Sequence, residues 1–187
     1  MNEATQRLFF ALWPDASTSD ALVTLAQQVA AESGGRPTAP GNVHVTVAFL
    51  GDQPRRIARE LSASAARISA PAFDLVLDQV DSWRKSAIAW AGVQSVPQPL
   101  VELHQALTRS LLVSGLEPDE RPFAVHVTLA RRIAAVVRRP LVPPLLWHVT
   151  AFALVASELD ASGARYRVLS SWPLAPGPGD DRQVGRK

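Results

Sequence analysis

A four-residue pattern, His-Val-Thr followed by an aliphatic residue, occurs at residues 44–47 and again at 126–129. Each copy lies in an apolar run of the kind that forms a β-strand. Side chains alternate between the two faces of a strand, so the His and the Thr of each copy point the same way. A fold that brings these two strands together would gather two imidazoles and two hydroxyl groups around one small space.

The length and composition predict one ordinary globular domain. The chain has 187 residues, 47% of them hydrophobic, which is enough for a substantial core. We expect residues 1–175 to form this domain and the Pro- and Gly-rich residues 176–187 to form a flexible tail. The chain has no cysteine, no apolar run long enough for a membrane span and no signal-peptide pattern. We therefore expect a cytoplasmic protein with no membrane partner. We also expect a monomer, although the sequence itself does not reveal the oligomeric state.

The periodicity of apolar residues alternates between helix and strand along the chain, which predicts an α+β fold. His126 follows His44 by 82 residues, close to half of the ordered chain, and each tetrad follows a strand and a helix. We interpret this as an internal duplication, with two lobes related by a pseudo-twofold axis. The predicted strands are 7–12, 43–50, 73–80, 87–93, 124–130, 147–157 and 165–171, and the predicted helices are 15–32, 54–69 and 99–114.

Two further histidines are predicted to be structural. His148 belongs to a third His-Val-Thr, which shows that the tripeptide alone is weak evidence for a site. It lies at the expected start of a late strand with no matching helix before it. His104 lies on the predicted third helix, on the side of Leu100 and Leu107. The pair at 44 and 126 differs because its members occupy equivalent places in the two halves.

Several kinds of site fit the two tetrads poorly. Zinc usually takes three or four His, Cys or carboxylate ligands, and neither tetrad contains a carboxylate. The chain has no nucleophile elbow, and no glycine-rich phosphate loop. Acid–base catalysis at phosphorus remains: one His takes a proton from water, the other protonates the leaving oxygen, and the Thr hydroxyls donate to phosphate oxygens. This chemistry needs no metal or other cofactor.

The chain resembles the 2H phosphoesterase superfamily, which is named for its two His-x-Thr-x motifs. Within it, the chain is similar to the bacterial and archaeal RNA 2′,3′-cyclic phosphodiesterases, also called 2′-5′ RNA ligases. The resemblance extends over residues 7–174 and includes segments 7–14, 44–51, 126–131 and the closing 155–174. It implies a bilobal α+β fold with a cleft between two antiparallel sheets and flanking helices.

The resemblance also implies the reaction, which is hydrolysis of a 2′,3′-cyclic phosphate at an RNA end to a 2′-phosphate, with 2′-5′ ligation as a minor activity. The substrates would be RNA ends, tRNA fragments among them, or cyclic nucleotides. Phe9 and Phe49 either line the nucleoside pocket or belong to the core. The implied roles are His44 as proton donor, His126 as proton acceptor, Thr46 and Thr128 as phosphate ligands, and Arg131 as a charged contact to phosphate or base.

Other interpretations remain open at this stage. The same fold could act on a small cyclic nucleotide or a 2′-5′ linkage, or could bind RNA without catalysis. Of the 19 basic residues, 17 are arginines, which suit bidentate contacts with phosphate, but the net charge of +2 is too small to predict nucleic-acid binding. The pairs Arg131-Arg132 and Arg138-Arg139 either guide an RNA strand or lie in solvated loops.

Overall fold

The computed structural model describes residues 4–117, 119, 121–160 and 163–177. The strands are β1 (Thr5–Leu12), β2 (Arg36–Pro37), β3 (Val45–Pro54), β4 (Phe73–Trp83), β5 (Ile88–Gly92), β6 (His126–Arg131), β7 (Arg139–Val149), β8 (Ala151–Asp160) and β9 (Gly163–Pro173). The α-helices are α1 (Ala16–Ser33), α2 (Ile57–Ala65) and α3 (Gln98–Val113), and the short 3₁₀ helices are η1 (Pro40–Asn42) and η2 (Arg84–Ser86).

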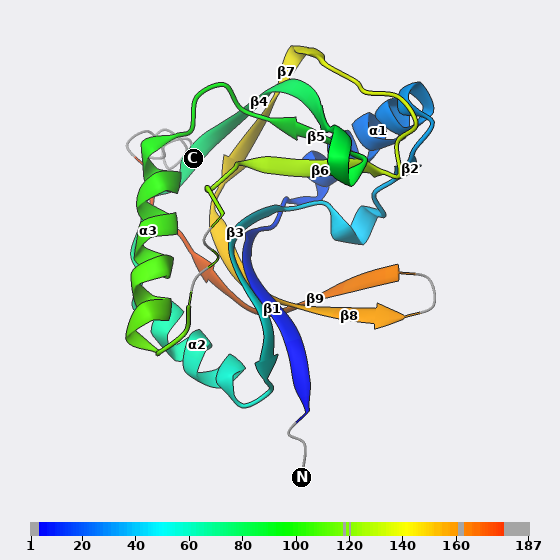
Figure 1. The fold of residues 1–187 in the computed structure, drawn as a ribbon. Coiled ribbons are helices and arrows are strands. Elements are labelled where there is room, and N and C mark those ends of the chain that lie inside the picture. The colour runs from blue at the N-terminus through cyan, green and yellow to red at the C-terminus, as the bar shows by residue number, and fades with distance from the viewer. Residues whose placement is uncertain (1–3, 118, 120, 161–162, 178–187) are drawn as a thin grey trace.

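The strands form one hydrogen-bonded series in the order β7-β4-β5-β6-β3-β1-β8-β9, with β2 beside β6 (Figure 1). We call β1, β3, β8 and β9 the first lobe and β4, β5, β6 and β7 the second lobe. Neighbouring strands pair antiparallel throughout. Among the described residues, the lobes meet at a single register pair, Val45 of β3 with Val127 of β6. The predicted α+β class is confirmed.

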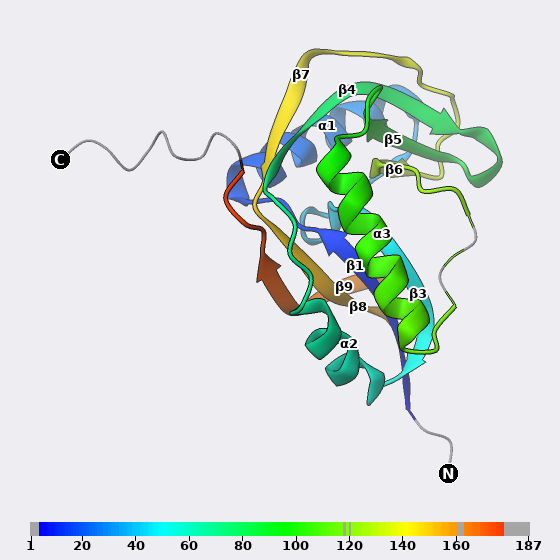
Figure 2. The same cartoon turned by 90° about the vertical axis from the view of Figure 1, so that its left-hand side faces the viewer.

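Each lobe is covered by a helix that connects two strands of the other lobe. Helix α1 leaves β1 of the first lobe, packs on β6 and β5 of the second, and returns to β3. Helix α3 leaves β5 of the second lobe, packs on β3 and α2 on the first-lobe side, and returns to β6 (Figure 2). This exchange ties the two lobes together, and one continuous hydrophobic core runs through both.

Local sequence signals explain where the helices begin and end. The Asp15 carboxylate caps α1 by accepting a hydrogen bond of 2.8 Å from the Thr18 amide, and Gly34 ends the helix at φ 66°, a left-handed conformation that favours glycine. Helix α3 buries Leu100, Leu103, Leu107 and Leu111 at helical spacing. The buried apolar residues of α1 and α3 hold these helices against the sheet and so fix the strands that carry the tetrads.

One predicted element was wrong. The expected strand 147–157 is the end of β7 and most of β8, which turn at Thr150, and β7 begins at Arg139, in a segment for which no strand was predicted. Pro140, Pro143 and Pro144 hid this strand, because proline cannot donate to a sheet ladder. Strand β7 lies at the edge of the sheet, where one side of the strand needs no donors.

The structure also locates the remaining parts of the predicted organisation. His148 lies near the end of β7, not at a strand start, and its exposed ring pairs with the Asp74 carboxylate at 2.7 Å. Within the described part of the chain, no helix is long and apolar enough to cross a membrane. Of the predicted tail, residues 178–187 lie outside the described residues.

Helix α3 offers a matched test of this core. Leu107 is fully buried, whereas Leu112 on the same helix is 57% exposed. We expect Leu107→Ala to lower the free energy of unfolding by about 2–5 kcal/mol, because it leaves a cavity. The same change at Leu112 should cost less than about 0.5 kcal/mol. Urea unfolding of both variants measures this, and equal losses would contradict the packing described.

Candidate active site

The two tetrads cross at the junction between the lobes. Val45 and Val127 pair antiparallel, and both side chains are fully buried in the core. The residues flanking this pair are His44 and Thr46 on one strand and Thr128 and His126 on the other, so they face away from the core. In an antiparallel pair, His44 then lies across from Thr128 and Thr46 across from His126. The junction therefore gathers all four polar side chains on one face.

The imidazole of His44 is enclosed by aromatic side chains of the first lobe. The Trp13 ring stacks on it at 5.7 Å between centroids, and the rings of Phe9 and Tyr166 lie 5.0 and 5.1 Å away. The Nδ1 atom of His44 bonds to the Asn42 carbonyl at 2.8 Å, and Nε2 bonds to the Thr46 hydroxyl at 3.0 Å. These contacts fix both the position of the ring and the direction of its two nitrogens.

The imidazole of His126 is held in the same way from the second lobe. Its Nδ1 bonds to the Ala124 carbonyl at 2.8 Å, and the Trp83 ring makes a T-shaped contact with the imidazole at 4.6 Å between centroids. In both histidines the partner of Nδ1 is thus the main-chain carbonyl two residues earlier. A carbonyl can only accept, so each neutral imidazole carries its proton on Nδ1 and has a lone pair on Nε2.

Burial and charge keep both histidines neutral in the free protein. The pKa of His44 falls from 6.5 to about 4, first because burial disfavours the charged ring, and also because His126 and Arg131 repel a positive charge there. The Asn42 carbonyl opposes this shift. The pKa of His126 is also lowered, mainly by burial and further by Arg131 and Arg121. At neutral pH, both Nε2 atoms are therefore proton acceptors.

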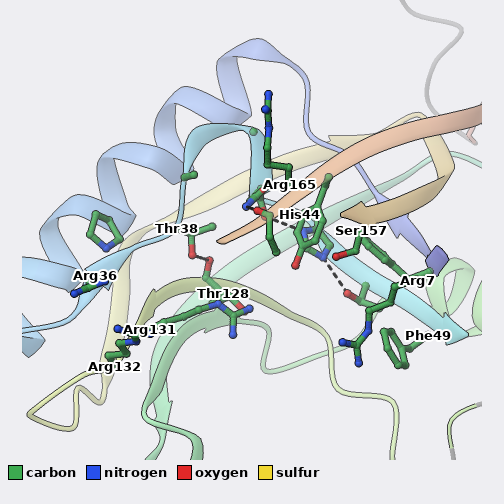
Figure 3. A pocket seen from close by; sticks show the side chains of 18 of the residues that line it. Arg7, Arg36, Thr38, His44, Phe49, Thr128, Arg131, Arg132, Ser157 and Arg165 are labelled. Carbon is green, nitrogen blue, oxygen red and sulfur yellow. Dashed lines mark hydrogen bonds between the residues drawn. The ribbon is translucent and has the colours of Figure 1, made fainter. Parts of the chain in front are cut away.

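A cleft of about 1080 Å³ opens over this face (Figure 3). His44, Thr46 and Thr128 line it, and His126 lies beside them across from Thr46. The described residues that line the cleft include no carboxylate, and six of them are arginines: Arg7, Arg36, Arg121, Arg131, Arg132 and Arg165. Such a lining attracts anions, and guanidinium groups suit phosphate oxygens.

Segments distant in sequence complete the walls of the cleft. The Thr38 hydroxyl donates to the Thr128 carbonyl at 2.8 Å, which braces the second tetrad from β2. The Asn42 amide donates to the Ala164 carbonyl at 2.6 Å and so ties the approach to His44 to β9. The guanidinium groups of Arg7 and Arg121 lie over the Phe49 ring, 5.0 and 6.0 Å from its centroid.

The structure brings together the residues that the tetrads and the resemblance singled out. Phe9, Phe49 and Arg131 line the same cleft as His44. Phe9 and Phe49 belong to a small apolar cluster separate from the main core, so they face the cleft.

Arg132 also lines the cleft, beside Arg131 of the first arginine pair. The second pair does not line it: Arg138 pairs with Asp81 at 3.0 Å and Arg139 with Glu32 at 3.3 Å.

The other two histidines lie away from these contacts. His148 is exposed on β7, and the Nδ1 atom of His104 bonds to the Val47 carbonyl at 2.8 Å while its ring stacks on Phe123. Sequence reasoning missed Trp13, Tyr166 and Trp83 as neighbours of the tetrad histidines. They come from three different strands or strand ends, so no local spacing could have shown them.

Within the described part of the chain, no group of three or more His, Cys, Asp or Glu side chains is placed to hold a metal ion. Around the tetrads themselves, the polar groups are imidazoles, hydroxyls and guanidinium groups. This donor set suits an anion better than a cation.

The chain is similar to a family of phosphoesterases and to characterised members of it. Residues 12–90 match the family model described as LigT like phosphoesterase. The chain is 35% identical to the RNA 2′,3′-cyclic phosphodiesterase of Escherichia coli K12, covering 90% of this chain and 97% of that protein. It is 30% identical to the enzyme of that name from Thermus thermophilus, covering 93% and 97%.

Solved structures agree with the sequence matches. The crystal structure of E. coli LigT in its apo form superposes with a TM-score of 0.82 at 34% identity, covering 92% of this chain and 99% of that one. The same E. coli protein has been solved in complex with 3′-AMP and with phosphate.

Proposed function

The chain belongs to the LigT-like phosphoesterase family, and from this premise we propose that it hydrolyses 2′,3′-cyclic phosphates at RNA ends to 2′-phosphates. One observation carries the proposal: the Val45–Val127 pair sets two His–Thr pairs on one face of an arginine-lined cleft. A phosphate bound there would meet an imidazole from each lobe. The E. coli relative, which binds phosphate and 3′-AMP, supports this ligand class.

The proposed step is an in-line displacement at phosphorus. The Nε2 atom of His126 takes a proton from water as the water oxygen bonds to phosphorus. The bond from phosphorus to the ribose O3′ breaks, and His44 gives a proton to O3′, which leaves the phosphate on O2′. Thr46 and Thr128 donate hydrogen bonds to the non-bridging oxygens, where negative charge grows. The family resemblance is the basis for choosing His44 as the donor.

This assignment requires His44 to gain a proton when substrate binds. In the free protein its pKa is about 4, because the ring is buried and His126 and Arg131 lie near it. The negative charge of a bound cyclic phosphate opposes both effects and raises the pKa. The Thr46 hydroxyl, which donates to His44 Nε2 in the free protein, is then released to donate to the phosphate.

The walls of the cleft support recognition of an RNA end. Phe9, Phe49 and Tyr166 offer apolar surface to the terminal nucleoside, and Arg131 a charged contact. The volume of about 1080 Å³ lies just above the range of roughly 300–1,000 Å³ that is typical of small-molecule sites. This favours an RNA end, such as that of a tRNA fragment, over a small cyclic nucleotide. A monomer acting in the cytoplasm completes the proposal.

Substitution of the histidines tests the proposal. His44→Ala and His126→Ala should each lower kcat/KM for a 2′,3′-cyclic phosphate at least about 10²-fold, because each removes a proton-transfer group. His148→Ala is the matched control, since His148 belongs to the third His-Val-Thr but is exposed on β7. It should keep nearly full activity. Full activity in either tetrad variant would refute the two-histidine mechanism.

The pKa shifts predict an acidic activity optimum. Turnover needs one histidine protonated and the other neutral, so kcat/KM should be bell-shaped between the two pKa values of the free protein. Both pKa values lie below 6.5, and activity therefore rises as the pH falls below neutrality and declines again in stronger acid. A pH profile of kcat/KM measures this. An optimum on the alkaline side of neutrality would contradict it.

A further inference from the structure

Two tryptophans, Trp83 and Trp90, lie beside His126 on the second lobe. Neither has a role in the proposed hydrolysis. The register pairs Asp81 with Trp90, Trp90 with Thr128, and Gly92 with His126. Paired residues share a face, and Trp83 shares the face of Asp81 two residues earlier. Trp83 and Trp90 therefore lie on the same face as His126 and Thr128. Their ring centroids are 5.4 Å apart.

The position of Trp90 depends on a glycine. A Cβ atom at Gly92 would lie 2.4 Å from Cζ3 of the Trp90 ring, so the ring covers Gly92, directly across from His126. Trp90 in turn packs against Trp83, whose ring forms a T-shaped contact with the His126 ring at an interplanar angle of 70°. Trp83 itself is 36% exposed and belongs to neither hydrophobic cluster. A large aromatic surface beside the second histidine thus remains open to solvent.

The two histidines therefore differ in what surrounds them. His44 is enclosed by Phe9, Trp13 and Tyr166 on the first lobe. In the proposed reaction this side holds the leaving O3′ and hence the terminal nucleoside. The nucleophile enters opposite the leaving oxygen, beside His126 and Trp83. A water molecule gains nothing from an aromatic surface there. A nucleoside that carries a 5′-hydroxyl gains a stacking contact, because bases stack on aromatic rings.

We infer that Trp83 forms the stacking platform of a second nucleoside site, occupied by the nucleoside whose 5′-oxygen lies beside His126. The inference rests on the proposed function. It gives Trp83 a specific role in the 2′-5′ ligation that the family resemblance implies and in the reversal of that ligation. In the reversal, the neighbouring O3′ attacks phosphorus, the bond from phosphorus to O5′ breaks, and O5′ leaves as a hydroxyl. His44 accepts the proton of the 3′-hydroxyl and His126 protonates O5′. The reverse step joins a 5′-hydroxyl to a cyclic phosphate.

The test compares two substrates in the full-length protein and in two variants. The substrates are adenosine 2′,3′-cyclic phosphate and a 2′-5′-linked diadenosine monophosphate, which alone places a nucleoside on Trp83. Trp83→Leu keeps an apolar side chain that cannot stack, whereas Trp83→Phe keeps an aromatic ring. The measured quantity is the ratio of kcat/KM for the dinucleotide to kcat/KM for the cyclic phosphate, so general damage to His126 cancels.

We expect Trp83→Leu to lower this ratio at least about tenfold, because the base loses its stacking partner. Trp83→Phe should lower it less than about threefold, because an aromatic ring remains. An unchanged ratio in Trp83→Leu, or a wild-type protein that does not cleave the dinucleotide, would overturn the inference. So would equal falls for both substrates, which would make Trp83 a support of His126 alone. Failure of the wild-type protein on the cyclic phosphate would instead refute the proposed function.

Discussion

The pairing of Val45 with Val127 is the constraint on which the site depends. It is the one register pair recorded between the lobes in the described residues, and both valines are fully buried. Because strand side chains alternate, burial of these two valines turns His44, Thr46, His126 and Thr128 to the opposite face. A shift of one residue in this register would send the histidines into the core. The exchange of α1 and α3 between the lobes protects the register, since neither lobe can slide without disturbing a helix packed on the other.

The electrostatics of the site follow from main-chain geometry as much as from side chains. Each tetrad histidine donates a hydrogen bond from Nδ1–H to a carbonyl two residues earlier, so in both rings Nε2 is the nitrogen that can accept a proton. Burial and nearby arginines lower both pKa values. The free site thus holds two neutral imidazoles among cationic arginines. A bound anion would supply the negative charge that stabilises a protonated imidazole there. Substrate binding and protonation are therefore linked, which couples recognition of phosphate to the chemistry that follows.

The apolar periodicity of the chain was sufficient to predict the α+β class, and the repeated tetrads were sufficient to predict the two histidines that meet, because strand alternation and apolar burial are properties of local sequence. Three features could not be predicted in this way. The prolines of β7 argued against a strand, and the edge position that tolerates them is a property of the whole sheet. The carbonyls of Asn42 and Ala124 act through the backbone, so residue type gives no signal. Tyr166 and Trp83 reach the histidines only through long-range strand pairing.

In the proposed reaction, two histidines open a cyclic phosphate without a metal ion and leave the phosphate on O2′. The most direct measurement is to incubate an RNA ending in a 2′,3′-cyclic phosphate with the protein in excess EDTA and to identify the position of the terminal phosphate by ³¹P NMR. The account predicts complete conversion to a 2′-phosphate in the presence of the chelator. A 3′-phosphate product, or an RNA end left unaltered until a divalent metal is restored, would contradict it.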